Sequence, residues 1–528
     1  MLSVPPERER RLSWRACRAA GLGLVLPGLL AAQTRDSAFR YARITYLTIT
    51  TAYVNAGRDD GLRDSTRLDV IRSGKRVGTI RISFLASHQA AGDIVDTVSA
   101  LVVGDSARYL PVAAPPTRVA TGPGRTYSRS RGSSLYGTVG VEYFSVTGDG
   151  VRLSQPGLDV RAFGGPAGSP LSIGLDLRER RVTTAAAGSP TAVADESRVY
   201  QAVARWQTPG SPVRVGIGRQ FVDGMPAVGL IDGLQIERAG PEWSTGAFAG
   251  TQPGLADLEV SGDIRELGAY VRRQGRPAAG GFWSVTAGAS GSYQGWRTNR
   301  EFFYFEARYF GPRLSGFLSQ EVDYYRPWKR IAGQSAFSPT ATFGDVRYQV
   351  SRAWSLEGGV DERRNVVLFQ DAVSPESTFD AAFRRGAWLG TTIRPGPHLL
   401  VDLDARASDG GSIGRTDSYT GALALERLGA LGGAFRFRGT RYLSPGRTGW
   451  LGAVNVGIAP ADRWRLAVDA GQRQESVTIL PGTQVTRWAG VDFDLSLARE
   501  WFGTVSFTRQ RGALQDTDQL FLLFTYRF

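Results

Sequence analysis

The chain has 528 residues, of which 42% are hydrophobic and 21% are charged, and its formal net charge is +14. Its mean hydropathy is −0.19, and no apolar run reaches about 18 residues, which excludes a helical membrane protein. The 66 glycines favour many short strands joined by turns over a helical bundle or solenoid. The composition therefore predicts an all-β protein.

Residues 1–33 have the pattern of a cleaved export signal. A basic segment comes first, an apolar stretch covers residues 19–30, and small residues follow at Ala31 and Ala32. The apolar stretch is too short to span a membrane, and polar sequence follows it at once. The only cysteine, Cys17, lies in this segment. The mature chain is therefore expected to have no disulfide, thiolate metal site or cysteine nucleophile.

Residues 34–112 differ in character from the rest of the chain. Alternating strands are expected at 44–54 and 77–85, with a hairpin turn at 73–75 and Gly-Asp pairs at 92–93 and 104–105. This spacing of turn glycines resembles the SH3-like small β-barrels attached to bacterial envelope proteins. The resemblance implies a small SH3-like domain, which we expect in the periplasm.

A linker rich in proline and glycine is expected at residues 113–133, because this stretch shows no periodicity. From residue 134 to 528 the pattern changes to a long series of alternating strands. At 399–406, for example, apolar residues alternate with Asp402, Asp404 and Arg406, so one face is apolar and the other charged. Similar runs occur at residues 171–178, 464–470 and 491–497.

Tryptophans lie at or near the ends of many of these expected strands. In a transmembrane barrel, aromatic residues in such places form girdles at the two membrane interfaces. The tryptophans in question are Trp206, Trp283, Trp354, Trp388, Trp450, Trp464, Trp488 and Trp501.

The last nine residues form the most informative of the expected strands. Counting back from the terminus, every second residue is aromatic or aliphatic: Phe528, Tyr526, Phe524, Leu522 and Leu520. An alternating strand that ends on a terminal aromatic residue resembles the closing strand of Gram-negative outer-membrane β-barrels. The resemblance implies that the insertion machinery reads these residues as a signal.

The strand series and its ending together predict a large antiparallel up-and-down transmembrane β-barrel of about 18–22 strands. The last strand should pair with a first strand near residues 134–144 and so close the barrel. We expect the protein in the outer membrane. Its expected partners are membrane lipid and the barrel-assembly machinery during insertion, with peptidoglycan or a periplasmic protein as a further partner.

Charged side chains between the apolar positions are predicted to face the lumen. They can shape a field that selects solutes by charge, or bridge neighbouring strands, and the sequence leaves both roles open. The net positive charge favours anionic solutes. The candidates are Arg161, Arg178, Arg205, Arg308, Asp402, Asp404, Arg406, Arg436, Arg438, Arg465, Asp469, Asp492 and Asp494.

A short motif lies within the strand series. Gly218, Arg219 and Gln220 close one expected strand, and Asp232 and Gly233 lie in the next. This pairing looks like the Gly-Arg-Gln…Asp-Gly pattern of alginate-export-type and related porins, which implies a porin.

The function predicted from these observations is a porin-like channel for passive or weakly selective passage of small hydrophilic, anionic solutes. The alternative is an outer-membrane anchor whose SH3-like domain binds peptidoglycan or an envelope partner. The sequence leaves open whether the small domain plugs the pore, docks beneath it or recruits a partner. It also does not specify the solute or the oligomeric state.

Other functions are not expected. The barrel segment has a single histidine, His398, and no recognisable serine motif, which argues against an enzyme. Histidine and cysteine are nearly absent, so neither a metal site nor a cofactor is expected. An exported protein without a basic cluster interleaved with aromatic residues is not expected to bind nucleic acid.

Overall fold

The computed structural model describes most of residues 40–109 and 135–528. The expected export signal (1–33) and the whole of the expected linker (113–133) lie outside the described residues, so both stay predictions. In the described part of the chain, no helix is long and apolar enough to cross a membrane. The residues outside the description are 1–39, 48–50, 58–59, 64–65, 73–74, 86–89, 98–100, 110–134, 167, 255–257, 276–280, 328–334, 365–382, 410–413, 430, 462, 499 and 513–515.

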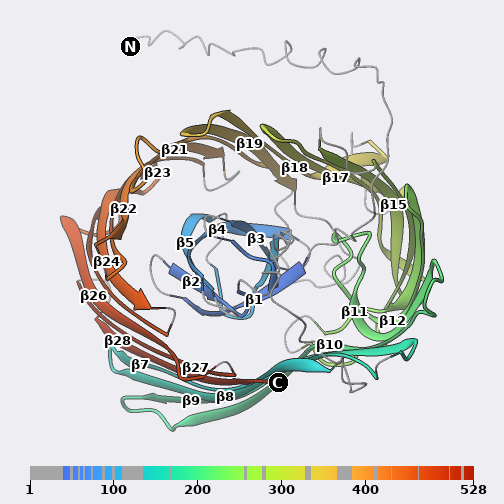
Figure 1. The fold of residues 1–528 in the computed structure, drawn as a ribbon, viewed down its shortest axis with the longest axis horizontal. Helices are drawn as coiled ribbons and strands as arrows, with labels where there is room; N and C mark the ends of the chain where they lie inside the picture. Colours follow the sequence, from blue (N-terminus) through green and yellow to red (C-terminus); the bar gives the residue numbers. More distant parts are fainter. Residues whose placement is uncertain are drawn as a thin grey trace, which may run out of the picture.

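Strands β7 to β28 form one closed antiparallel barrel of 22 strands, here called the large barrel (Figure 1). Each strand pairs with its neighbours in the sequence, and the number lies at the upper end of the predicted range, which confirms the large-barrel prediction. The strands are β7 (Tyr136–Gly148), β8 (Val151–Gly164), β9 (Leu171–Ala186), β10 (Ala192–Trp206), β11 (Val213–Phe221), β12 (Leu230–Ala239), β13 (Trp243–Thr251), β14 (Ile264–Gln274), β15 (Phe282–Gln294), β16 (Arg297–Phe310), β17 (Leu314–Tyr324), β18 (Phe337–Ser351), β19 (Trp354–Arg364), β20 (Phe383–Ile393), β21 (Leu399–Asp409), β22 (Arg415–Leu428), β23 (Gly433–Ser444), β24 (Arg447–Ala461), β25 (Trp464–Val477), β26 (Thr483–Ser496), β27 (Trp501–Gly512) and β28 (Thr517–Arg527).

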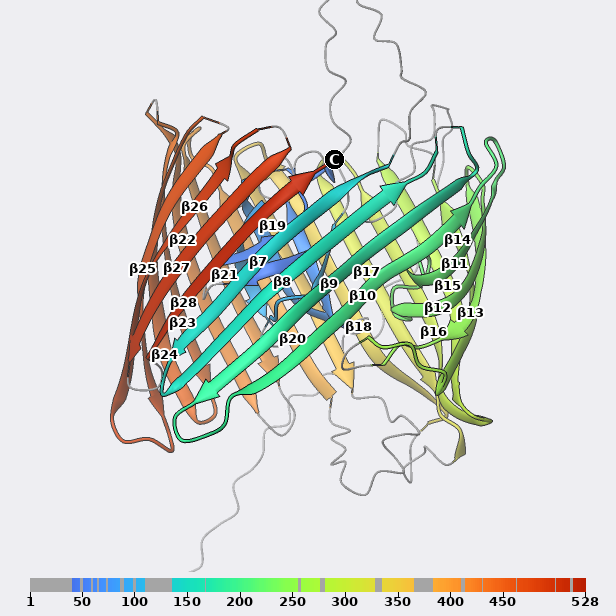
Figure 2. The same ribbon diagram turned by 90° about the horizontal axis from the view of Figure 1, so that it is seen from below.

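The barrel closes between its last and first strands, as the sequence predicted. Strand β28 pairs with β7, and Leu522 lies opposite Tyr143 in this pair. Gly137 and Phe528 exchange two backbone hydrogen bonds of 3.1 Å. Because the number of strands is even, the last strand ends at the rim where the first begins (Figure 2).

The two faces of the wall differ in polarity because apolar and polar residues alternate along each strand. Apolar side chains on the outer face are exposed all around the barrel, for example Leu389 (66%), Ile217 (61%) and Val141 (61%). A soluble protein does not expose apolar surface of this extent, whereas a transmembrane barrel presents such a band to lipid. Leu522, Phe524, Tyr526 and Phe528 belong to this outer face.

Strands β1 to β6 form a second closed barrel, here called the small barrel. Its strand order is β1-β2-β5-β4-β3-β6. The strands are β1 (Arg40–Leu47), β2 (Thr51–Val54), β3 (Arg67–Arg72), β4 (Lys75–Leu85), β5 (Ala90–Thr97) and β6 (Ser106–Tyr109). This architecture is compatible with the SH3-like resemblance, which itself stays a prediction.

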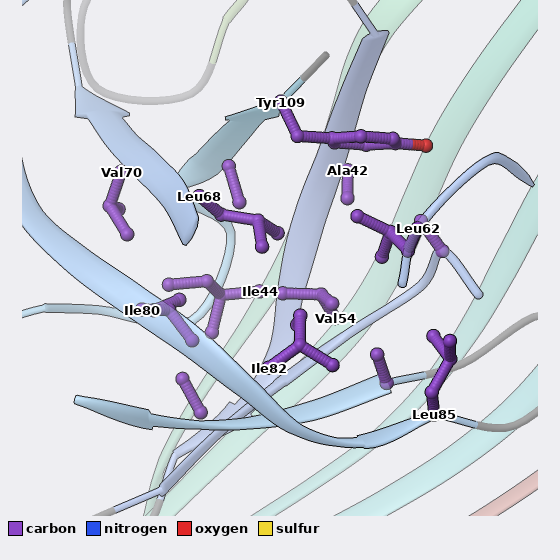
Figure 3. Close-up of a cluster of buried hydrophobic side chains, with 14 of the residues drawn as sticks. Ala42, Ile44, Val54, Leu62, Leu68, Val70, Ile80, Ile82, Leu85 and Tyr109 are labelled. Atoms are coloured by element: carbon purple, nitrogen blue, oxygen red, sulfur yellow. The ribbon is translucent and has the colours of Figure 1, made fainter. Parts of the chain in front are cut away.

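The small barrel has a hydrophobic core of its own (Figure 3). Ile44, Leu68 and Ile80 are completely buried in it, and Tyr109 covers one end. A core that is closed on itself does not need the wall of the large barrel to bury its apolar side chains.

The small barrel lies inside the lumen of the large barrel (Figures 1 and 2). This position differs from the periplasmic position expected from the sequence and agrees with one of the arrangements that the sequence left open, in which the small domain lies in the pore. The difference has a physical reason: the contacts that hold the small barrel join residues hundreds of positions apart, such as Arg67 and Glu357, and no local pattern reveals them.

Candidate functional site

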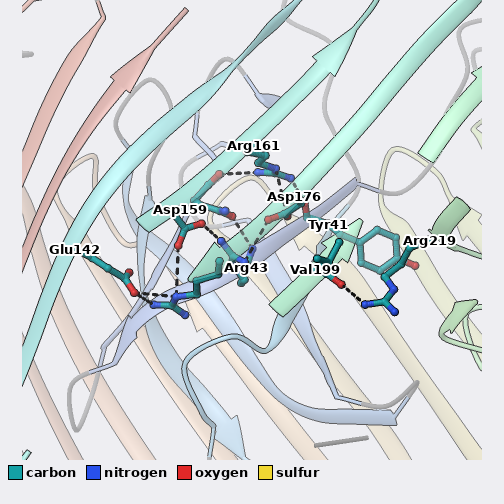
Figure 4. A network of polar contacts seen from close by, with 10 residues as sticks. Tyr41, Arg43, Glu142, Asp159, Arg161, Asp176, Val199 and Arg219 are labelled. Atoms are coloured by element: carbon teal, nitrogen blue, oxygen red, sulfur yellow. Dashed lines mark hydrogen bonds and ion pairs between the residues drawn. The ribbon is translucent and has the colours of Figure 1, made fainter. Parts of the chain in front are cut away.

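The first contact between the two barrels is a charged cluster around Arg43 of β1 (Figure 4). The guanidinium of Arg43 forms ion pairs with Asp159 of β8 and, at 3.2 Å, with Asp176 of β9. It also lies 4.5 Å from the centre of the Tyr200 ring of β10. Burial lowers the pKa of Arg43, and the charge of Asp176 opposes this effect. Arg43 is thus a desolvated cation held by wall carboxylates.

Wall arginines also reach into the small barrel and bind its backbone. Arg161 of β8 donates hydrogen bonds to the carbonyl oxygens of Asn55 (3.0 Å) and Tyr41 (2.9 Å). Arg438 of β23 donates to the carbonyl oxygen of Ile94 at 2.9 Å. Backbone carbonyl groups of the small barrel that face the wall thus accept hydrogen bonds from charged donors.

A second charged contact joins β3, β4 and β6 to the opposite part of the wall. Arg81 pairs with Asp402 at 2.7 Å, and Arg67 pairs with Glu357. Burial disfavours the charged form of Arg81, but the charges of Asp402 and Glu357 outweigh it and raise the pKa of Arg81. Arg108 of β6 lies 4.0 Å from the carboxylate of Glu306.

Apolar and aromatic contacts complete the interface. Tyr53 and Ala91 of the small barrel pack against Phe521 and Leu523 of β28. On another side, the Tyr41 ring stacks on Phe221 of β11 with 5.0 Å between the ring centres.

The order of these contacts shows that the two barrels are arranged one inside the other. Going around the small barrel, β6, β3, β4, β5, β2 and β1 contact the wall in turn. The wall strands that they meet follow in the same circular order: β16, β19, β21, β23, β28 and β8. The small barrel is therefore held from all around the lumen, and this occupied lumen is the candidate functional site.

A segment between β11 and β12 also folds into the lumen, beside the small barrel (Figure 1). Val222 and Met225 are almost fully buried and pack with Ile231 and Tyr270 of the wall. At Gly224, a Cβ atom would lie 2.1 Å from the Tyr270 ring, so only glycine allows this close approach.

The Gly-Arg-Gln…Asp-Gly motif lies at the base of this inward segment. Arg219 and Asp232 face each other across β11 and β12 and form two bonds of 2.6 Å. The Gln220 amide donates to the carbonyl oxygens of Gly216 and Gly233. In this chain the motif therefore joins the two ends of the segment between β11 and β12. The bidentate pair of Arg219 and Asp232 fixes the geometry of this junction.

Next to this base is a small polar cavity of about 10 Å³, enough for a single water molecule. Arg214 pairs across it with Asp223 at 3.0 Å and with Glu237 at 3.1 Å. Arg205, one of the predicted lumen residues, lines the same cavity.

All of the predicted lumen residues lie on the wall face opposite the exposed apolar side chains. Arg161, Asp402 and Arg438 contact the small barrel directly. Arg178 pairs with Glu142 and, at 3.4 Å, with Asp159, the partner of Arg43. The role of these residues in lining a conducting pore stays a prediction.

Several of the remaining predicted residues have partners within the wall. Arg465 pairs with Asp494 at 3.1 Å, Ser506 donates to Asp492 at 2.5 Å, and Arg308 pairs with Glu306. The other members of this group are Asp404, Arg406, Arg436 and Asp469, which are at least partly buried on the same face.

Two tryptophans expected at the membrane interfaces lie elsewhere. Trp388 and Trp488 are in the middle of β20 and β26 and face the lumen. Each ring covers a glycine directly opposite on the neighbouring strand, Gly359 and Gly471 respectively. The expectation was wrong for these two residues, because their parity along the strand, which the prediction ignored, decides the face.

Sequence reasoning also missed the apolar residues on the lumen face. Phe521 and Leu523 lie in the polar register of the last strand, yet they are only 2% and 8% exposed because the small barrel covers them. Large apolar residues at strand positions that should face water indicate that another part of the protein covers them. Phe521 and Leu523 could therefore have indicated a protein partner inside the lumen. Among the described residues, no group of three or more His, Cys, Asp or Glu could hold a metal ion.

The sequence matches no protein-family model and no curated protein. Among solved structures, the P pilus usher (PapC) translocation pore shares 10% identity over 75% of this chain and 99% of its own, with a TM-score of 0.46. Pseudomonas aeruginosa OpdQ shares 11% identity over 75% and 99%, with a TM-score of 0.36. Pseudomonas aeruginosa OccK7 (OpdD) shares 12% identity over 76% and 99%, with a TM-score of 0.37.

Proposed function

We propose that the protein is an outer-membrane channel for small hydrophilic solutes, closed at rest by the small barrel. The observation that carries the proposal is the occupied lumen: a closed 22-strand wall, apolar outside and polar inside, around a separately folded barrel. A wall of this size is too wide for its own side chains to fill. Removal of the small barrel would therefore leave a wide aqueous passage.

The kind of contact supports a displaceable small barrel. Charged pairs and bonds to backbone carbonyls dominate the interface, whereas the apolar core of the small barrel is closed on itself. Water and counterions can replace such contacts when the barrels separate. The periplasmic position expected from the sequence then corresponds to the displaced state.

The covalent connection between the barrels is long enough for this movement. Residues 110–135 join Tyr109 to Tyr136, and a chain of this length spans at most roughly 85 Å when extended. The longest wall strand, β9, has 16 residues and a length of roughly 53 Å. The small barrel could thus leave the lumen without a break in the chain.

A weak preference for anions in the resting state is a further part of the proposal. At rest, arginines of the small barrel pair with Asp159, Glu357 and Asp402 of the wall, so these carboxylates repel anions less. The net charge of the chain acts in the same direction, because it stays positive after removal of the expected export signal with its five arginines and two glutamates. The anchor alternative would need the surface of the small barrel for an outside partner, and the wall contacts occupy much of that surface.

Conductance of the full chain in planar lipid bilayers tests this function. The unchanged protein should show a small conductance with rare large openings, and Arg81→Asp should open often because two carboxylates then face each other. Adding Asp402→Arg to Arg81→Asp should restore closure, because the pair is rebuilt with its charges exchanged.

Arg40→Asp is the matched control, since Arg40 is an exposed arginine of the same barrel whose hydrogen bond goes to Asp60 within that barrel. It should behave like the unchanged protein. A steady large conductance in every protein would contradict closure by the small barrel. No conductance in any protein would contradict the channel.

A further inference from the structure

Each of six neighbouring wall strands, β16 to β21, contributes either a carboxylate or an aromatic ring to one group on the lumen face. We call this group the acidic–aromatic belt. Neighbouring strands place its members close in register: Phe317 lies opposite Arg308, next to Glu306, and Trp388 lies opposite Gly359, next to Glu357. The belt consists of Glu306, Phe317, Phe343, Glu357, Trp388 and Asp402.

In the structure, guanidinium groups of the small barrel occupy the belt along its length. The guanidinium of Arg108 lies 5.1 Å from the centre of the Phe317 ring, and that of Arg76 lies 4.7 Å from Phe343. The Arg76 guanidinium is also 5.4 Å from the Trp388 ring.

The carboxylates of the belt hold the same kind of group. Glu357 pairs with Arg67 and lies 4.0 Å from Arg81, which pairs with Asp402. Ring faces beside carboxylates are the surroundings that favour a planar, weakly hydrated guanidinium over a compact ammonium.

The centre of the belt is built for a flat ligand. A Cβ atom at Gly359 would lie 2.2 Å from the Trp388 ring, so the missing side chain lets this ring lie against the wall with one face toward the lumen. Glu357 and Asp402 on either side are each 8% exposed. Thr392 donates a hydrogen bond of 2.6 Å to Asp402 and holds its carboxylate in place.

The wall also places cations near the belt, and they limit where it can be selective. Arg308 pairs with Glu306, and Arg406 lies 5.9 Å from the Trp388 ring. Arg347 lies opposite Glu357 in register. Glu306 therefore keeps a cationic partner when the small barrel leaves. Asp402 keeps the Thr392 hydroxyl but loses the Arg81 guanidinium, and the Trp388 ring loses Arg76.

We propose that the acidic–aromatic belt binds guanidinium groups of solutes when the small barrel is displaced. The open lumen then prefers organic cations that carry a guanidinium, which is the reverse of the resting preference for anions. The inference rests on the proposed channel and names the solute class of its open state. Its physical basis is that displacement of the small barrel removes four guanidinium groups from the belt and leaves behind the carboxylates and rings that they contacted. The four groups belong to Arg67, Arg76, Arg81 and Arg108.

Selectivity of the opened channel is the first test. The full chain with Arg67→Ala and Arg81→Ala is opened in a planar bilayer, and its reversal potential is measured across a potassium chloride gradient. We expect a preference for cations. Arginine amide should block the current at a concentration at least about tenfold lower than citrulline amide, which has the same shape without the charge.

A belt variant in the same opened chain locates the site. Trp388→Leu should raise the blocking concentration of arginine amide by about tenfold, since a cation–π contact of this kind is worth roughly 1–2 kcal/mol. Trp354→Leu is the matched control, because Trp354 is exposed on the outer face. An opened channel that prefers anions, or that arginine amide and citrulline amide block equally, would overturn the inference and leave the channel standing.

Binding without conductance separates the two proposals. In detergent, full-length Arg81→Ala should bind methylguanidinium in a calorimetric titration, because the ion fills the place of the lost side chain beside Asp402. Methylammonium should bind at least about tenfold more weakly, and adding Asp402→Asn should abolish binding. Absence of methylguanidinium binding overturns the belt, whereas binding in a chain that never conducts contradicts the channel alone.

Discussion

Replacing Arg43 by methionine should release the small barrel from the wall. Methionine keeps most of the length of the side chain and removes its charge, so the two partly buried carboxylates that Arg43 contacts lose a partner. Removing one partner of a buried ion pair costs about 3–5 kcal/mol. Here the cost should be smaller, because Asp159 keeps Arg178 at 3.4 Å and Asp176 keeps Arg161 at 3.7 Å.

A cost of about 2–3 kcal/mol remains after this correction, and it shifts the equilibrium between the docked and displaced states by roughly 30- to 150-fold. The labelling rate of a single cysteine measures this shift. Ala91→Cys places the thiol where the small barrel meets β28, at a position that is 1% exposed. The only natural cysteine, Cys17, lies in the expected export signal.

If reclosing is fast, the rate at which a water-soluble maleimide labels the introduced thiol follows the displaced fraction. Arg43→Met should therefore raise this rate by roughly 30- to 150-fold. Arg40→Met removes an exposed arginine of the same strand and should leave the rate unchanged. Equal rates in the two variants would refute the assignment of Arg43 as a contact that holds the small barrel in the lumen.

Three further predictions concern the wall. Phe521→Ala should increase maleimide labelling of the Ala91→Cys thiol, because the cavity left under the small barrel costs about 3 kcal/mol of docking free energy. Phe524→Ala on the lipid face should leave this labelling unchanged, and equal labelling in the two variants would contradict the packing of Phe521 against the small barrel. Gly359→Leu should drive the neighbouring tryptophan ring off the wall and raise the open probability in a bilayer, and an unchanged open probability would contradict the close approach. Tyr143→Cys with Leu522→Cys should form a disulfide visible as a gel shift under oxidising conditions, and failure to form it in the folded protein would contradict the closing pair.

The sequence alone was sufficient for the local features of the fold. Alternation along β21 separates Leu403, 50% exposed on the outer face, from Asp402 and Asp404 on the lumen face, because successive side chains of a strand point to opposite sides. The same rule correctly placed Phe524 and Tyr526 on the outer face. Closure of the expected barrel correctly paired the last strand with the first. Assigning a side chain to one face of its own strand needs no knowledge of distant residues.

Only the tertiary structure decided what fills the lumen. Two ion pairs between the barrels show this: Arg43 with Asp159, and Arg81 with Asp402. Nothing in the local sequence distinguishes these four residues from other charged residues, because the partner of each lies far away in the chain. Sequence alternation assigns a side chain to a face of a strand, but it cannot say whether water or another barrel lies against that face. For this reason the wall and the pairing of its last and first strands could be predicted, whereas the sequence left open whether the small barrel plugs the pore and did not identify the wall carboxylates that hold its arginines.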